Sequence, residues 1–421
     1  MRADDIVSAV TGVTQKWAKQ RKAEERQASR VYNRRYVMAR SSRITIKDVA
    51  WEVMEEAYLK ASSNGQYPAH ARQIMYAARP QILAKADCDA LDDAYFTQQL
   101  LPDYMQEHPG LTAKWDVVFD ARGHLREPHT KMQVPLGTLD VRSYLAKIDE
   151  HVVEEISATV GSDRFPTMGP HNRYGAILFI EKEGFLPLFQ KVQLRERYDI
   201  AVMSTKGMST EAARLLVDTL CSQDVRLLVL HDFDKSGFSI VGTLQRDTRR
   251  YRFRNDVHVI DLGLRLQDVQ DWNLQAEQCN FGKSDPASNL CENGATNEEI
   301  KFLCAGWDGH RYYGQRVELN AFASGDLVQW VERKLQQQGV KKVIPDGTTL
   351  QAAYRRAALT YIVNGQLKSL LKTAKEKVDA TELQPDQIAR DIRKRLKKSP
   401  AMSWDQAITE IVAKEQEVGN A

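Results

Sequence analysis

VRLLVLHDFDKSGF, residues 225–238, decides the fold: an apolar run of strand length ends in two aspartates, Asp232 and Asp234, and a glycine. Three other short apolar runs have the same character, and helix-like segments separate all four. This alternation predicts an α/β domain with a parallel sheet and helices on both faces. The other three runs are AILFIE (176–181), IAVMS (200–204) and VHVID (257–261).

Carboxylates follow two of these predicted strands. Glu181 ends the first run, and Asp232 and Asp234 follow the third. Ligand chemistry in an open parallel sheet lies beyond the carboxyl ends of the strands, so the three side chains are expected at one edge. Hard oxygen donors with no His or Cys beside them suit Mg²⁺. The sequence therefore predicts a magnesium site made of Glu181, Asp232 and Asp234.

The region before the sheet has a different order of elements. Three helical segments (46–62, 69–83 and 89–109) precede two strand-like runs, WDVVFD (115–120) and HLREPH (124–129), joined by the turn ARG. Helices followed by a hairpin are the order of a winged-helix module. Arg122 and Arg126 at the wing would suit phosphate contacts, and a plain solvent-exposed hairpin is the alternative.

The net charge of +3 over 421 residues is a sum of unlike parts. Residues 16–43 hold ten Lys and Arg against two Glu, in a segment (1–43) that predicts one basic helix. RDTRRYRFR (246–254), which includes Arg249 and Arg250, and RDIRKRLKK (390–398) are also strongly basic, so the rest of the chain is acidic. Basic tracks beside an acidic edge favour a polyanionic partner such as DNA.

After the sheet, the pattern predicts an irregular stretch (279–313), a helix (318–338) and a helical tail to the end of the chain. The apolar runs are shorter than a membrane span, and the chain has no Walker A sequence for ATP. The five cysteines form no CxxC pair, which favours a reducing, cytoplasmic setting, here nucleoid-associated.

Several segments resemble one family. IEKEGF (180–185), STKGMSTEAAR (204–214) and LHDFDKSGFSI (230–240) are similar to the Toprim domain found in the A subunit of topoisomerase VI and in the related meiotic double-strand-break transesterase. The later segments LGLRLQDV (262–269) and RVELNAF (316–322) resemble it too. The resemblance places the family's three acids on Glu181, Asp232 and Asp234. It places the family's glycine turn on Lys206 and Gly207, with Lys206 as a DNA contact.

With this resemblance, the expected fold is a multi-domain α/β chain: a CAP-like winged helix, then a Rossmann-like Toprim sheet, with helical extensions. The expected domains are a basic partner-docking segment (1–43), the winged helix with a catalytic tyrosine (44–165), the Toprim domain (166–345) and a helical tail (346–421).

The resemblance also implies a tyrosine nucleophile, which RQIMY (72–76) supplies. Arg72 and Tyr76 are four residues apart and share a helix face, so the guanidinium could hold the phosphate that the phenolate attacks. In the family this motif reads Arg, acid, aliphatic, aromatic, Tyr; here Gln73 replaces the acid and Met75 the first aromatic.

The implied function is that of the DNA-cleaving subunit of a type IIB topoisomerase-like enzyme. It would make Mg²⁺-dependent double-strand breaks by transesterification, with Tyr76 linked to the 5′ phosphate. The family further implies a homodimer on double-stranded DNA, with ATP used only by a separate GHKL-type ATPase B subunit. Two alternatives stay open: a Toprim nuclease that hydrolyses DNA, for example in defence against foreign DNA, and a non-catalytic DNA-binding subunit.

Overall fold

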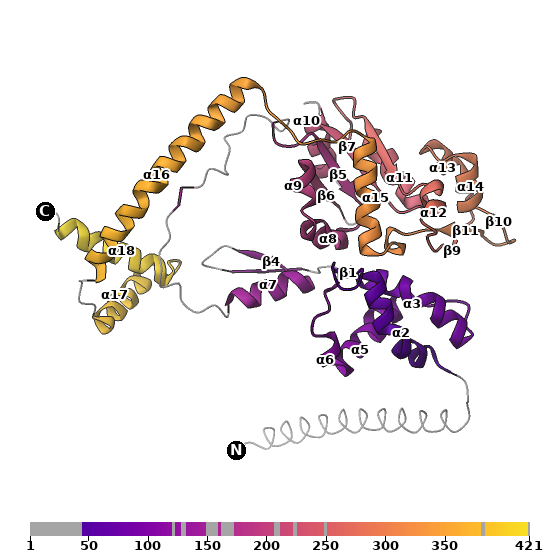
Figure 1. Cartoon of the computed structure of the whole chain (residues 1–421), viewed down its shortest axis with the longest axis horizontal. Coiled ribbons are helices and arrows are strands. Elements are labelled where there is room, and N and C mark those ends of the chain that lie inside the picture. The colour runs from indigo at the N-terminus through magenta and orange to yellow at the C-terminus, as the bar shows by residue number, and fades with distance from the viewer. Residues whose placement is uncertain are drawn as a thin grey trace, which may run out of the picture. The chain divides into compact units, whose positions relative to one another are not determined.

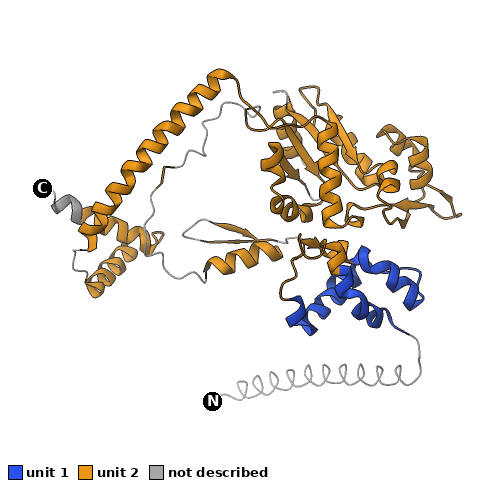
Figure 2. Cartoon of the chain, viewed as in Figure 1, with its two compact units in different colours: residues 1–57, 75–112 blue, residues 58–74, 113–421 orange. Residues whose placement is uncertain are grey.

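The computed structural model divides the chain into two compact units (Figure 2), each taken here by itself. One comprises residues 1–57 and 75–112, and the other residues 58–74 and 113–421. The predicted basic helix 1–43 lies outside the described residues. The structure describes residues 44–119, 123–127, 132–148, 159–160, 172–205, 211–221, 225–247, 251–379 and 384–419.

The first unit is helical in its described part. Its helix α2 starts after Thr45, whose hydroxyl accepts from the Asp48 amide at 3.2 Å while the Asp48 carboxylate accepts from the Thr45 amide at 3.1 Å. This reciprocal cap fixes the start of the helix predicted at 46–62. Helices α2 and α3 contribute residues to both units. The helices are α2 (Ile46–Ala61), α3 (Ala71–Ala86), α4 (Asp93–Tyr95), the π-helical turn η1 (Phe96–Leu100), α5 (Leu101–Glu107) and α6 (Pro109–Thr112).

The second unit contains a four-stranded parallel sheet (Figure 1). Its order is β6-β5-β7-β8, so the first and third predicted strands are neighbours, with Ile180 opposite Leu230. All four predicted strands and their parallel pairing are confirmed. Their bounds are β5 (Ala176–Ile180), β6 (Ile200–Ser204), β7 (Arg226–Leu230) and β8 (Val259–Gly263).

Apolar side chains on both faces hold this sheet. Leu178 and Leu228 belong to one buried cluster, whereas the next residues along the strands, Phe179 and Val229, belong to another. Since successive residues of a strand point to opposite faces, both faces are covered, as predicted. Helix α11 ends at Gln245. The elements around the sheet are η3 (Glu183–Phe185), α8 (Leu186–Lys191), α9 (Leu194–Tyr198), α10 (Glu211–Cys221), α11 (Lys235–Gln245), α12 (Leu266–Asp271) and α15 (Ser324–Gln337).

The prediction of an irregular stretch at 279–313 is wrong. These residues contribute to a small antiparallel sheet, in the order β10-β11-β9, and to two short helices. Elements this short do not show a full hydrophobic period, so the sequence pattern missed them. The predicted helix 318–338 is a short 3₁₀ turn followed by α15. The elements are β9 (Glu277–Asn280), α13 (Ala287–Glu292), α14 (Asn297–Leu303), β10 (Gly306–Trp307), β11 (Tyr312–Arg316) and η4 (Leu319–Ala321).

The predicted hairpin of 115–120 with 124–129 is also wrong. Val117 and Val118 are buried and pair in parallel with Ala69 and His70, while the exposed residues 124–126 pair with 133–135. Two consecutive buried valines suit a short strand covered on both faces, not one side of an exposed hairpin. The winged-helix assignment of residues 44–165 stays a prediction. The elements are β1 (Ala69–His70), β2 (Val117–Val118), β3 (His124–Arg126), β4 (Gln133–Pro135) and α7 (Thr138–Ile148).

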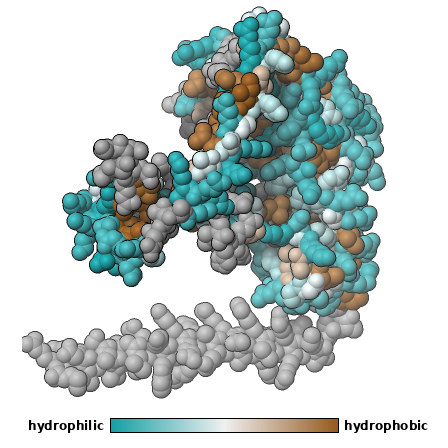
Figure 3. All heavy atoms as spheres, turned by 60° about the vertical axis from the view of Figure 1, so that its left-hand side comes forward, coloured by the Kyte–Doolittle hydropathy of each residue, from teal (hydrophilic) through white to brown (hydrophobic). Residues whose placement is uncertain are grey.

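The C-terminal region is helical, as predicted, with α16 (Gly347–Asp379), α17 (Pro385–Lys398) and α18 (Trp404–Gly419). Among the helices of the described residues, none combines the length and apolar character needed to cross a bilayer. Hydrophilic side chains make up most of the described surface in the view of Figure 3, and apolar ones form separate patches.

Candidate active site

The three predicted acids lie at the carboxyl ends of two neighbouring strands. Glu181 follows β5, and its amide donates to the carbonyl of Leu230, the last residue of β7, at 3.3 Å. Asp232 and Asp234 follow β7 directly. The sheet order therefore brings the predicted acids to one edge, as expected for parallel strands.

Each aspartate accepts a hydrogen bond from a backbone amide. Asp232, 3% exposed, accepts from the Leu319 amide at 2.8 Å. Asp234 caps helix α11, and its carboxylate accepts from the Gly237 amide at 2.7 Å. A Cβ on Gly237 would lie 2.1 Å from the Asp232 carbonyl oxygen and 2.4 Å from Nδ1 of His231. Only glycine fits there, so the tight turn after β7 depends on it.

Electrostatics at this edge show an excess of negative charge near Glu181. Burial raises the pKa of Glu181 to about 7, and the charges of Asp232 and Asp234 add to the rise. Burial and the Asp232 charge also raise the pKa of Asp234. Carboxylates that repel one another in a partly desolvated place favour a nearby cation.

Lys182 supplies one cation at this edge. Its ammonium lies 2.7 Å from Oδ2 of Asp232 and 2.7 Å from Oε2 of Glu318. Burial alone would lower the pKa of Lys182, but the charges of Asp232 and Glu318 outweigh it and raise the pKa. The ammonium therefore stays charged between the two carboxylates.

Glu318 collects several cations. Its carboxylate accepts from Nη1 of Arg72 at 3.1 and 2.8 Å and lies 3.3 Å from Nη2 of Arg316, in addition to Lys182. Burial would raise the pKa of Glu318, but Lys182 and Arg72 lower it to about 2. The sequence reasoning missed Lys182 and Glu318 as site residues. The signal was present, since both lie in segments, IEKEGF and RVELNAF, that carry the family resemblance.

Gln73, which stands where the family has an acid, has a role that an acid could not fill. Its Oε1 accepts from the His70 amide at 2.8 Å at the start of α3, and its Nε2 donates to the Phe322 carbonyl at 2.9 Å. A carboxylate could accept the first bond but could not donate the second. Gln73 and Arg72 thus attach the start of α3 to the segment around Glu318.

Tyr76 lies on α3, one helical turn after Arg72, and is 1% exposed. It belongs to the first compact unit, whereas Arg72 and the three acids belong to the second. Its role as nucleophile stays a prediction.

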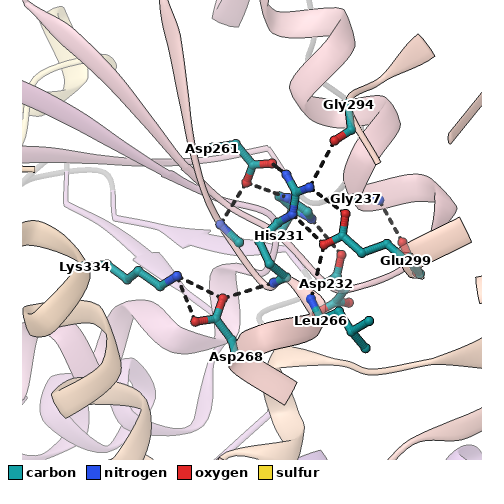
Figure 4. Close-up of polar contacts among 12 residues, drawn as sticks. His231, Asp232, Gly237, Asp261, Leu266, Asp268, Gly294, Glu299 and Lys334 are labelled. Atoms are coloured by element: carbon teal, nitrogen blue, oxygen red, sulfur yellow. Dashed lines mark hydrogen bonds and ion pairs between the residues drawn. The ribbon is translucent and has the colours of Figure 1, made fainter. Parts of the chain in front are cut away.

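A second polar cluster contacts the turn that carries Asp232 and Asp234, called the DxD turn (Figure 4). The ring of His231 lies between two acceptors, with Nδ1 2.7 Å from the Asp232 carbonyl oxygen and Nε2 3.0 Å from Oδ1 of Asp261. Arg265 then bridges Asp261, at 2.8 Å, and Glu299, at 2.6 Å. Burial would lower the pKa of His231, but the hydrogen bond and charge of Asp261 raise it. The sequence did not single out these residues.

Of the predicted DNA-contacting residues, Arg126 lies on β3 and is exposed. The other four, Arg122, Lys206, Arg249 and Arg250, lie outside the described residues.

The acids fit a divalent cation by their chemistry. Oε2 of Glu181 is buried and has no hydrogen-bond partner among the described residues, and all the donors are hard oxygens. Within the described part of the chain, no three metal-ligating side chains are already grouped around one point. Lys182 pairs with Asp232, and the Gly237 amide donates to Asp234, so two of the three carboxylates already have partners.

Comparison with known proteins agrees with this geometry. Residues 176–338 match the family model of the Toprim domain of Spo11 and of the topoisomerase 6 A chain. The matched range includes β5 to β8, all three acids, Lys182 and Glu318. A comparison with curated proteins found no match. Over residues 176–338, the chain therefore contains a Toprim domain of the kind found in Spo11 and the topoisomerase 6 A chain.

Proposed function

We propose that this protein is the DNA-cleaving subunit of a topoisomerase VI-like enzyme, which breaks double-stranded DNA by tyrosine transesterification. The observation that carries the proposal is the set of acids at the carboxyl ends of β5 and β7 inside a matched Toprim domain. Glu181, with a buried and unpartnered carboxylate oxygen, supports a cation site there.

Glu181, Asp232 and Asp234 would hold Mg²⁺, which when bound offsets charge on the phosphate oxygens. The chain's own part is to hold these acids in place. The Leu319 amide orients Asp232, and the Gly237 amide orients Asp234. His231 fixes the backbone between the two aspartates through the Asp232 carbonyl.

In the proposed reaction, the Tyr76 oxygen attacks a backbone phosphorus and forms a 5′-phosphotyrosyl ester. The tyrosine hydroxyl loses its proton as it attacks, the bond from phosphorus to the 3′ oxygen breaks, and that oxygen takes up one proton to leave as a 3′ hydroxyl, so no net proton is gained or lost. The number of phosphate ester bonds is unchanged, so the reverse reaction can reseal the strand. Arg72 would hold the phosphate if it exchanged Glu318 for it.

The family supports further parts of this proposal. We infer that the active form is a homodimer, that a separate GHKL-type ATPase subunit supplies any ATP dependence, and that residues 1–43 dock it. Arg122, Arg126, Lys206, Arg249 and Arg250 are the proposed DNA contacts, and the protein is proposed to be cytoplasmic and nucleoid-associated.

A hydrolytic Toprim nuclease is the second candidate, and the burial of Tyr76 favours it. A side chain that is 1% exposed must be uncovered before it reaches a phosphate, whereas water needs no such change.

A cleavage assay distinguishes the two functions. It uses supercoiled plasmid, Mg²⁺ and ATP, with and without the candidate ATPase subunit. Both predict that Glu181→Gln and Asp232→Asn abolish cleavage. Only the topoisomerase-like function predicts that Tyr76→Phe abolishes it too. Cleavage that survives loss of the acids would contradict both, and salt-sensitive DNA binding without any cleavage would identify a non-catalytic subunit.

A further inference from the structure

Helix α17, labelled in Figure 1, follows the matched Toprim range in the chain, and its sequence carries a stripe of cations. Five exposed basic residues recur at the spacing of one helix face, and they define the α17 basic stripe. At 1.5 Å per residue the stripe is about 12 Å long. Its members are Arg390, Arg393, Lys394, Lys397 and Lys398.

The charges of the stripe are not neutralised within the described residues. None of its five members forms an ion pair with a described side chain. A sixth cation, Arg395, differs: it is half-buried and lies 2.6 Å from Glu410 of α18. One basic residue therefore joins the two helices, and five remain available to an external anion.

The other side of α17 is occupied. Ile388, Ile392 and Leu396 recur every four residues and are half-buried, and α17 packs against α18, where Ala407 and Ile411 are buried. A helix that binds a membrane surface inserts its apolar face into the lipid. Because α18 covers that face of α17, the observations favour a polyanion that binds charge alone.

We propose that the α17 basic stripe binds the phosphate backbone of duplex DNA, as a second contact separate from the Toprim edge. Lys and Arg on a helix contact phosphates without reading bases, so this contact is independent of DNA sequence. This proposal rests on the proposed function only because it takes DNA as the substrate. Its role is to hold a segment of the duplex while the cleavage site acts.

The test uses the full chain in metal-free buffer with EDTA, so that no cleavage intervenes. Binding of a fluorescent duplex of about 40 base pairs is measured at several salt concentrations. The variant replaces all five stripe residues by Gln, which keeps the helix. It should bind more weakly, and the slope of log K against log salt should fall by up to about 4.5, at about 0.9 for each of the five lost phosphate contacts. Circular dichroism confirms retained helix content.

The matched control replaces five exposed lysines on other elements, and its slope should stay close to that of the wild-type chain. These are Lys114, Lys283, Lys301, Lys341 and Lys342. The proposal is overturned if stripe and control variants bind DNA alike, or if the stripe variant loses binding only to phosphatidylserine vesicles or to an acidic peptide. Cleavage assays in Mg²⁺ report separately on the proposed function, because failure to form a tyrosine adduct leaves the EDTA result unchanged.

Discussion

The guanidinium of Arg72 and the carboxylate of Glu318 lie 2.8 Å apart, which joins the first turn of α3 to the edge of the Toprim sheet in the same chain. Glu318 also holds Lys182, and Lys182 holds Asp232. The arginine of RQIMY is thus linked through three consecutive ion pairs to one of the acids proposed to bind Mg²⁺. In the proposed reaction, a DNA phosphate would compete with Glu318 for Arg72.

Glu318→Gln should therefore destabilise the protein strongly. The substitution leaves Lys182 and Arg72 without their shared counterion in a partly buried place, and breaking such a pair costs about 3 kcal/mol or more. Urea unfolding measures the change in free energy. The control is Glu332→Gln, whose partner Arg197 is 47% exposed and whose loss should cost about 1 kcal/mol or less. Equal losses of unfolding free energy in the two variants would contradict the role of Glu318 as the shared counterion of Lys182 and Arg72.

Lys182→Gln should tighten the binding of a divalent cation. The ammonium occupies Oδ2 of Asp232, so it competes with and repels a metal ion at the same carboxylate. We expect the affinity for Mn²⁺, followed by electron paramagnetic resonance, to rise about tenfold, which is about 1.4 kcal/mol. Lys334→Gln is the control, since Lys334 pairs with the buried Asp268 instead. Weaker Mn²⁺ binding in Lys182→Gln would mean that the lysine supports the metal site.

Gly237→Ala should disrupt the DxD turn. The new Cβ would lie 2.1 Å from a backbone oxygen, so Asp232 and the start of α11 must move. The expected result is a lower melting temperature together with weaker Mn²⁺ binding. Gly282→Ala is the matched control, because a Cβ there meets no atom within 4 Å. A Gly237→Ala protein that is as stable as this control would contradict the described geometry.

Asp261→Asn should remove a pH-dependent part of the stability. Burial alone would raise the pKa of Asp261, but His231 and Arg265 lower it to about 2, below its ordinary value of 3.8. A lowered carboxyl pKa stabilises the folded state above the ordinary value, and this stabilisation is lost as pH falls toward the folded value. The wild-type chain should exceed the variant by about 2 kcal/mol at pH 7, with the gap closing between about pH 4 and pH 2. A gap that stays constant across this range would rule out the titration of Asp261 as its source.

The strands of the sheet and the acids that follow them could be predicted from the sequence, because they depend on local pattern. Four apolar runs identified the four parallel strands, and because chain order places acids after β5 and β7, Glu181 and Asp232 could be assigned to one edge. Val117 pairs with Ala69 and not with the segment 124–129 across the nearest turn. This pairing depends on burial, and two adjacent valines indicate burial only weakly.

The ion pairs of the site could not be predicted in the same way. Lys182 and Glu318 are far apart in the chain, and neither has a periodic neighbour that marks it. Gln73 illustrates the same limit. In the sequence it is only a departure from the family motif. Its two hydrogen bonds to backbone groups explain why an amide stands there.

The central claim is that Tyr76 becomes covalently attached to DNA, and mass spectrometry of the trapped product tests it most directly. The protein, with its ATPase partner, Mg²⁺ and ATP, is denatured during cleavage, treated with nuclease and protease, and analysed for peptides that carry a nucleotide. The account predicts a 5′-phosphotyrosyl nucleotide on the peptide containing Tyr76, absent in Tyr76→Phe. DNA that is cut to free 5′ phosphates, with no nucleotide on any tyrosine, would contradict it.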